Sequence, residues 1–369
     1  MYKEVFTKPD GRRLVLYGRD PIRIDGRGPG RSDGVLPDPP GGRVEGGSHL
    51  RWHPLREEWV AYAPARQERT FLPPPEWDPL APTTDPARPT ELPAGAWDVA
   101  VFDNRFPTLA AAAPDPPAAI VATAPGAGAC EVVVFTQART GALGLLPLAQ
   151  VELVVDVWAD RTTQLGERPD VTYVMPFENR GVEVGVTIDH PHGQIYAYPF
   201  VPPLPARERA AQIRHYARHG RTLLEDHIAR EVADGKRVIA EGGDAIAFVP
   251  VCARYPYEIW VAPRRPVAWL GALAAAERAA FARVLKTVLL QIDGLWNRPC
   301  PYVLVLHQAP TDGGSHPDAH LHVELYPAYR SAGRLKYLAG TEIGAGMFAN
   351  DVTPEDAARA LRAVAVEVA

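Results

Sequence analysis

Cysteine is scarce in this sequence, and long apolar runs are missing. Three cysteines occur among 369 residues, Cys130, Cys252 and Cys300, too few for a disulfide framework and too widely spaced for a C-x-x-C metal knuckle or redox pair. No uninterrupted apolar stretch approaches the roughly 18 residues of a membrane span, and the first residues, MYKEVFTKPDGRR, contain no apolar signal region. These absences predict a protein of the reducing cytoplasm that has no membrane partner.

An excess of positive charge is also lacking. Lysine and arginine number 39 against 44 acidic residues, a formal net charge of −5. This balance excludes a broad basic surface for nucleic acid, so any phosphate-binding site must be local. Hydrophobic residues (46%) and charged residues (22%) are in ordinary globular proportion, which argues against a disordered or fibrous chain.

Proline and glycine, in contrast, are plentiful, with 39 and 31 residues, and they gather in two stretches. Residues 1–48 show no sustained apolar period, which predicts loops with one short strand at RRLVLYG (12–18). The second stretch, FLPPPEWDPLAPTTDPARPTELPAG (71–95), predicts a long irregular surface segment.

An internal repeat organises the rest of the chain. The segments VVVF (132–135), YVMPFENRG (173–181) and HPHGQIYAYPF (190–200) are followed, at offsets of 126, 129 and 130 residues, by EIWV, YVLVLHQAP and HLHVELYPA. Each unit reads strand, helix, strand, strand. The pattern predicts an α+β fold of two repeated units, residues 1–202 and 203–369, whose antiparallel-rich sheets form half-barrels with helices on one face.

Two further helices are expected. One runs from about Pro205 to Ala233, and the other closes the chain, with Thr353 as N-cap, Pro354 at the first helical position and Asp356 three residues after the cap.

The segment HPHGQ carries the clearest chemical signal. A histidine that attacks phosphorus needs a neutral ring with one nitrogen free and the other held as a donor, which the turn around His192 can provide. Gln194 lies two residues on, on the same strand face, and can donate to a phosphoryl oxygen without adding charge. The alternative is a polar strand with no catalytic role.

The sequence FENRGVEVGVTIDHPHGQIYAYPF resembles the active-site segment of the galactose-1-phosphate uridylyltransferases, members of the histidine triad superfamily. The resemblance extends to HPLREEWVAYAPARQERT, FDNRFPTL, CEVVVF, ARYPYEIWVAP and KYLAGTEIGAGMFANDVTPEDAARALR, and so covers nearly the whole chain. It implies histidine-triad-like units that act as a homodimer on a nucleotide sugar and a hexose 1-phosphate. UMP would pass between UDP-glucose and galactose 1-phosphate by a ping-pong mechanism through a uridylyl-histidine.

The same resemblance assigns roles to individual residues. His192 matches the nucleophile and Gln194 the glutamine that binds the transferred phosphoryl group. The positions matching substrate-binding residues are Arg66, Arg69, Asn104, Phe106, Asn179, Gly185, Thr187, Lys336, Tyr337, Ala339 and Glu342. In known relatives the arginine pair acts across the dimer interface.

No cofactor is required for this chemistry, but the family has metal sites. In many members two cysteines and two histidines hold a zinc, whereas this chain has Asp78, Ala81 and Arg139 at three of those positions and keeps His190 alone. The resemblance thus implies a lost zinc site, and we expect an Asp78–Arg139 ion pair in its place. A second site, for zinc or iron, would be formed by Glu208, His307, His322 and Glu324.

Two other functions stay open on the sequence alone. The first is nucleotidyl transfer with another substrate pair, as in ADP-glucose phosphorylases. The second is that of a non-catalytic nucleotide-sugar-binding homologue, which the missing zinc ligands suggest.

Overall fold

The computed structural model describes residues 1–25, 47–69, 72–74 and 77–369, and part of the arm expected at residues 1–48 lies outside these ranges. The chain divides into two units. The first comprises Met1–Gly141, Thr163–Pro176 and Thr187–Pro203, and the second comprises Ala142–Thr162, Phe177–Val186 and Leu204–Ala369. The division expected at residues 202 and 203 is coarser than this, because two segments before residue 202 belong to the second unit.

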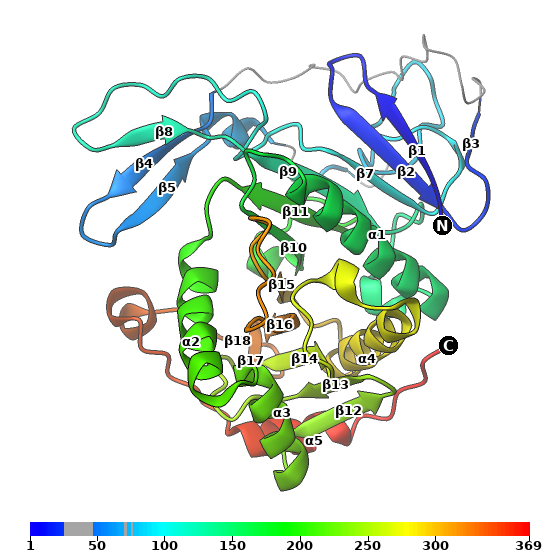
Figure 1. Ribbon diagram of the computed structural model, residues 1–369. Coiled ribbons are helices and arrows are strands. Elements are labelled where there is room, and N and C mark those ends of the chain that lie inside the picture. Colours follow the sequence, from blue (N-terminus) through cyan, green and yellow to red (C-terminus); the bar gives the residue numbers. More distant parts are fainter. Residues whose placement is uncertain (26–46, 70–71, 75–76) are drawn as a thin grey trace. The chain divides into compact units, whose positions relative to one another are not determined.

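The first unit contains an antiparallel sheet with the strand order β1-β2-β7-β9-β11 (Figure 1). Its strands are β1 (Tyr2–Thr7), β2 (Arg13–Gly18), β7 (Val99–Asp103), β9 (Ala129–Val134) and β11 (His192–Tyr198). A smaller sheet joins β5 (Glu58–Tyr62), β4 (His49–His53) and β8 (Thr123–Pro125), and β3 (Arg23–Ile24) pairs with β6 (Gly95–Ala96). The strand expected at 12–18 is therefore confirmed as β2.

The proline-rich segment is partly buried, which corrects its expected place on the surface. Leu80 and Leu92 are 3% and 1% exposed, and both pack in one apolar cluster with Phe102 of β7 and Val134 of β9. Hydrogen bonds from Thr90 Oγ1 to the carbonyls of Ala81 and Leu92 brace the segment internally. Irregular backbone that is rich in proline can thus still supply core side chains.

The second unit contains an antiparallel sheet with the strand order β10-β15-β16-β14-β13-β12, of which Phe177–Arg180 of β10 belongs to this unit. The strands are β10 (Tyr173–Arg180), β12 (Val238–Gly242), β13 (Ala245–Phe248), β14 (Ile259–Pro263), β15 (Tyr302–His307) and β16 (His322–Pro327). A short hairpin of β17 (Tyr329–Ser331) and β18 (Arg334–Leu335) follows.

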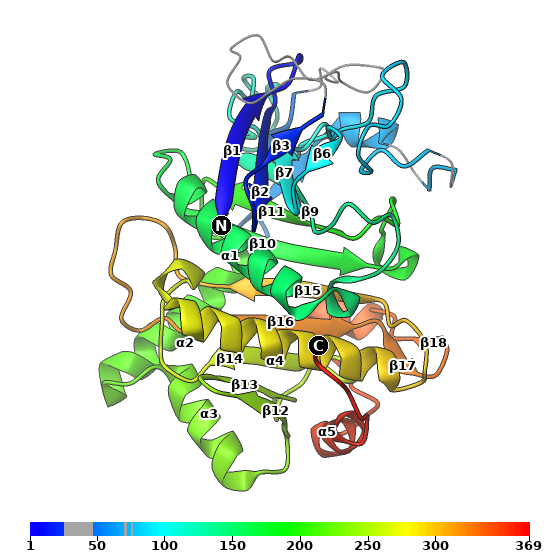
Figure 2. The same ribbon diagram turned by 90° about the vertical axis from the view of Figure 1, so that its right-hand side faces the viewer.

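Helices cover both faces of the second unit's sheet, and the expectation of one helical face is wrong here. Leu224 and Ile228 of α3 pack against Ile246 of β13. Ala245, the neighbour of Ile246, points to the opposite face of the sheet, and its strand partner is Gly242. A side chain at Gly242 would contact α4, so α4 covers that opposite face. Figure 2 shows α4 lying along β12, β13 and β14.

The helices are α1 (Leu148–Gly166), α2 (Pro203–His219), α3 (Leu223–Asp234), α4 (Ala275–Gly294) and α5 (Pro354–Arg362). Short 3₁₀ or π turns lie at η1 (Pro64–Glu68), η2 (Leu143–Leu145), η3 (Val182–Val184), η4 (Leu270–Ala272) and η5 (Gly340–Ala345). Within the described residues, no helix combines the length and apolarity needed to cross a membrane.

The single helix expected over 205–233 is two helices. Gly220 adopts φ 66°, which glycine tolerates without strain, and ends α2. Thr222 then caps α3, because its Oγ1 accepts a hydrogen bond from the Glu225 amide at 3.1 Å.

The closing helix α5 begins as expected. Pro354 occupies its first turn, and the Asp356 amide donates to Thr353 Oγ1 at 3.2 Å. The cap prediction is confirmed.

A buried carboxyl group lies in β10 of the second unit. Tyr302 Oη donates to Glu178 Oε2 at 2.8 Å, and Glu178 is 3% exposed. Burial, which outweighs this hydrogen bond, raises the pKa of Glu178 to about 7. The folded protein therefore keeps this proton at pH values where the unfolded chain has lost it.

We expect the free energy of unfolding to contain a term that falls as the pH rises from about 4.5 to about 7, because unfolding then releases a proton. Glu178→Gln keeps the acceptor without the charge, so its stability relative to wild type should rise by up to about 3 kcal/mol between pH 5 and pH 8. Urea unfolding at both pH values measures this, with the exposed Glu367→Gln as control. A difference that does not change with pH would contradict the prediction.

Candidate active site

The candidate nucleophile stands at the start of β11 in the first unit. His192 pairs with Val134 of β9, and Gln194 pairs with Val132. Side chains alternate along a strand, so His192, Gln194 and Tyr196 share one face while Ile195, which is fully buried, points to the other. The structure thus brings the two expected catalytic residues together.

The ring of His192 is held at one nitrogen. Nδ1 donates to the carbonyl oxygen of His190 at 2.7 Å. In the described part of the chain, no group hydrogen-bonds to Nε2. Burial lowers the pKa of His192, although the bond to His190 opposes this. A neutral imidazole with a free Nε2 lone pair is the form that attacks an electrophile.

His190 is held at both ring nitrogens. Its Nδ1 lies 2.7 Å from Asp78 Oδ2, and its Nε2 lies 2.8 Å from the Thr136 carbonyl oxygen. The expected Asp78–Arg139 ion pair is wrong, because no such pair exists among the described residues and the carboxylate turns to His190 instead. Arg139 contributes only a weak, more distant charge effect on the Asp78 pKa.

The residues at the family's zinc positions do not fit zinc. Zinc needs three or four N, S or O ligands. Ala81 has no donor atom and is 1% exposed, Arg139 is a cation, and both nitrogens of His190 already have partners.

Two expected nucleotide-binding positions and one arginine lie close together in the first unit. Arg66 Nη1 donates to the Phe106 carbonyl at 3.2 Å and to Tyr196 Oη at 3.3 Å. The Phe106 amide donates to Asn104 Oδ1 at 2.8 Å. Tyr196 was missed by the sequence reasoning, although its position two residues after Gln194 on an alternating strand could have revealed it. Arg69 ends the η1 turn that carries Arg66.

The remaining positions that we expect to line the phosphates belong to different units. Asn179 lies in β10 and Gly185 follows the η3 turn, both in the second unit, whereas Thr187 belongs to the first. Gly185 has φ 85°, which favours glycine at this position.

The segment that matches the sugar-contacting residues forms a braced loop in the second unit. Lys336 Nζ donates to Glu342 Oε1 at 2.8 Å and to the Ala349 carbonyl at 2.6 Å. Glu342 also accepts from the Ala339 amide, and its pKa is held well below the usual range, chiefly by Lys336. Tyr337 is 72% exposed.

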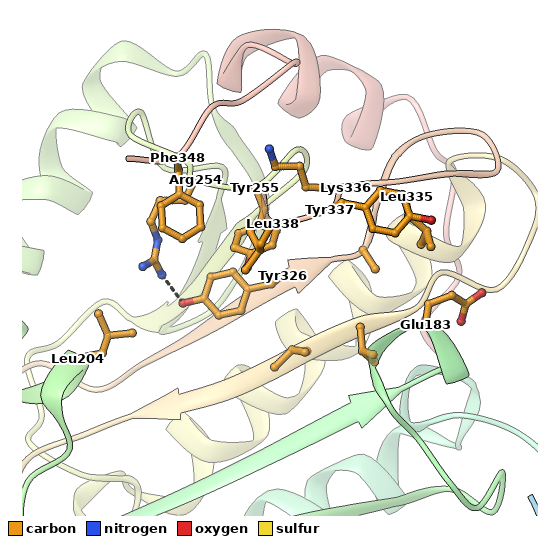
Figure 3. A pocket seen from close by; sticks show the side chains of 13 residues that line it. Glu183, Leu204, Arg254, Tyr255, Tyr326, Leu335, Lys336, Tyr337, Leu338 and Phe348 are labelled. Atoms are coloured by element: carbon orange, nitrogen blue, oxygen red, sulfur yellow. Dashed lines mark hydrogen bonds between the residues drawn. The ribbon is translucent and has the colours of Figure 1, made fainter. Parts of the chain in front are cut away.

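Part of this loop lines an open cavity of about 520 Å³ (Figure 3). Lys336 and Tyr337 lie on one side, and Arg254, Tyr326 and Phe348 lie on another. Arg254 donates to Tyr326 Oη at 2.7 Å and lies over the Phe348 ring at 5.2 Å. The cavity therefore combines aromatic walls with cationic groups.

The four residues of the expected second metal site converge. Potential ligand atoms of Glu208, His307 and His322 lie within 4.8 Å of one another, with His307 Nδ1 at 2.7 Å from Glu208 Oε2. Glu324 lies 3.7 Å from His307 Nε2 and 3.8 Å from His322 Nε2. This donor set fits a divalent transition metal such as zinc or iron.

The two H-x-H segments share one hydrogen-bonding pattern. His322 Nδ1 lies 3.0 Å from the His320 carbonyl, and His320 Nε2 lies 2.8 Å from the Pro263 carbonyl, as in the first unit. The direction of the pKa shift differs, however. Burial opposes charge on His322, but Glu324 outweighs it and raises the His322 pKa. The pKa shifts of the second histidines of the two segments therefore run in opposite directions, down for His192 and up for His322.

Comparison with known proteins gives this geometry a family. The models of the N-terminal and C-terminal domains of galactose-1-phosphate uridyl transferase match residues 43–202 and 208–368. The chain belongs to the galactose-1-phosphate uridylyltransferase family.

The match to individual relatives covers almost the whole length of each relative. The galactose-1-phosphate uridylyltransferase of Thermotoga maritima is 37% identical over 326 residues, which cover 86% of this chain and 99% of the relative. That of Streptomyces lividans is 36% identical over 377 residues and 96% of each chain. A solved uridylyltransferase structure matches with a TM-score of 0.77 at 32% identity, covering 86% of this chain and 98% of the other.

The two active-site histidines should differ in chemical reactivity. Diethyl pyrocarbonate acylates an unprotonated imidazole nitrogen, so at pH 6 we expect it to label His192 and to spare His190, whose nitrogens are both hydrogen-bonded and buried. Peptide mass spectrometry measures both rates, and the exposed His219 serves as the labelled reference. Equal labelling of His190 and His192 would contradict the assigned roles.

Proposed function

We propose that this chain transfers UMP between UDP-glucose and galactose 1-phosphate. The observation that carries the proposal is the ring of His192, which is neutral, held at Nδ1 by the His190 carbonyl and free at Nε2. The curated relatives named above bear the name of this activity, which supports the choice of substrates.

The reaction proceeds in two displacements at one phosphorus atom. His192 Nε2 attacks the α-phosphorus of UDP-glucose, the bond from that phosphorus to the bridging oxygen breaks, and glucose 1-phosphate leaves with the electron pair. A phosphate oxygen of galactose 1-phosphate then attacks the uridylyl-histidine. This second step releases UDP-galactose and returns the electron pair to Nε2.

No proton transfer is needed in either step. The leaving group is a phosphate dianion, which is weakly basic, and a neutral imidazole needs no base. What remains for the protein is in-line positioning and neutralisation of phosphate charge. Gln194 lies beside His192 on the same face and can donate to a phosphoryl oxygen, and Arg66 and Arg69 supply positive charge in the same unit.

The finer assignments are part of the same proposal. Asn104 and Phe106 would bind uridine, Asn179, Gly185 and Thr187 the phosphates, and the 336–342 loop the hexose phosphate. The side chains of Lys336 and Glu342 already brace that loop, so they would act first by shaping it. A cytoplasmic homodimer, with arginines shared across its interface, is inferred from the family resemblance alone.

The decisive experiment is isolation of the intermediate. Incubation with UDP-glucose labelled in the α-phosphate, without acceptor, should leave a phosphoramidate adduct that is labile in acid and stable in base. His192→Ala should abolish it, while His215→Ala, which alters a histidine outside the site, should not. Addition of galactose 1-phosphate should discharge the adduct as UDP-galactose.

The outcomes separate the candidate functions. An adduct that forms from ADP-glucose and not from UDP-glucose would point to the phosphorylase-like reaction. Absence of an adduct with either nucleotide sugar, together with retained binding, would indicate a non-catalytic homologue.

We also propose that Glu208, His307, His322 and Glu324 hold one zinc or iron ion that supports the second unit's structure. Purified protein should contain about one such ion per chain. His307→Ala and His322→Ala should each remove it in metal analysis and lower the melting temperature, whereas His227→Ala should keep it. Unchanged metal content in both variants would contradict the site.

A further inference from the structure

We propose that the Asp78–His190 pair is a metal-free positioning device for His192, acting where other family members place a zinc ion. This inference deepens the proposed function, on which its catalytic readout rests. Asp78 is a positioning residue, because it touches His190 and not the reacting atoms.

The first argument is a series of hydrogen bonds that runs from Asp78 through His190, side chain and backbone, to the nucleophile. The Leu80 amide donates to Asp78 Oδ1 at 2.9 Å, and Asp78 Oδ2 accepts from His190 Nδ1 at 2.7 Å. The His190 carbonyl in turn accepts from His192 Nδ1 at 2.7 Å. Fixing the His190 side chain therefore fixes the carbonyl that orients His192.

The second argument concerns charge. Both ring nitrogens of His190 face acceptors, the Asp78 carboxylate and the Thr136 carbonyl, so both must carry hydrogen. Burial opposes ionisation of Asp78, but the bond and charge of His190 outweigh it and lower the Asp78 pKa. The contact is thus a short, directional hydrogen bond from a ring N–H to a carboxylate. A ring whose two nitrogens both face hydrogen-bond acceptors offers no lone pair to a metal.

The third argument is that the loop bearing Asp78 has its own anchor. The neighbours Leu80 and Ala81 are 3% and 1% exposed, and Leu80 belongs to the apolar cluster on β7 and β9. Alanine at a former ligand position thus contributes to the core. Burial of these side chains holds the loop against the sheet, so Asp78 is not needed as an anchor and can serve to orient His190.

The test compares Asp78→Ala and Asp78→Asn with Asp85→Asn, an exposed aspartate in the same proline-rich segment. In single-turnover measurements with UDP-glucose, Asp78→Ala should lower the rate of uridylyl-enzyme formation by about 10- to 100-fold and change KM less than about twofold. Asp78→Asn can still donate its amide to a neutral His190, so it should recover part of the rate. Asp85→Asn should match wild type.

A spectroscopic readout tests the pair without any reaction. With nitrogen-labelled histidine, the wild type should show a low-field Nδ1 proton from His190, bonded to the carboxylate. The signal should disappear in Asp78→Asn, persist in Asp85→Asn, and survive dialysis against EDTA. A signal that emerges only after chelation would place a metal on His190 and overturn the proposal.

Two results would separate this inference from the proposed function. If Asp78→Ala forms the adduct at the wild-type rate, the positioning role is overturned while the function stands. If the wild type forms no adduct, the function fails, and positioning is judged by the rate at which diethyl pyrocarbonate labels His192. An Asp78→Ala labelling rate equal to that of Asp85→Asn would then overturn it.

Discussion

The hydrogen bond from His192 Nδ1 to the His190 carbonyl is the constraint on which the chemistry of this chain depends. It selects the tautomer whose Nε2 is unprotonated, and it sets the plane of the ring. Burial then keeps the ring neutral by lowering its pKa. Strand β11 begins at this residue, so the sheet fixes the backbone that the bond orients. One backbone carbonyl thus leaves Nε2 with its lone pair free, and the ring needs no catalytic base.

The two H-x-H segments share a backbone geometry and differ in the residue that lies beside the second histidine. His192 and His322 each begin a strand and each donate Nδ1 to the carbonyl two residues earlier. The residue two positions on, which shares the strand face, is Gln194 in one case and Glu324 in the other. The carboxylate raises the pKa of His322 and offers a further ligand, whereas the neutral amide leaves His192 uncharged. On the proposed roles, the neighbouring side chain therefore decides whether this backbone geometry presents a nucleophile or a metal ligand.

Local patterns in the sequence predicted local structure well. The H-x-H repeat, the β2 strand and the Thr353 cap depend on residues near one another in the chain, and each could be seen there. The break between α2 and α3 is also a local feature, since Gly220 is a common residue after a helix end and Thr222 a common N-cap. It was not predicted, because the apolar pattern continues across both residues. The Asp78–His190 contact was not predictable in this way, because it joins residues 112 positions apart. Two charges of opposite sign, Asp78 and Arg139, suggested a pair that the fold does not make.

The proposed replacement of a metal by the Asp78–His190 pair is physically consistent only because apolar packing supplies the binding energy. A buried ion pair adds little net stability, since desolvation of both charges offsets their attraction. Zinc can tie a loop to a sheet by its ligand bonds alone, but Asp78 and His190 cannot. Here Leu80 and Leu92 bury the loop against β7 and β9, at about 2 kcal/mol for each fully buried leucine. Because packing already holds the loop, the Asp78–His190 contact need only orient the His190 ring. That orientation fixes the His190 carbonyl, which in turn holds the ring of His192.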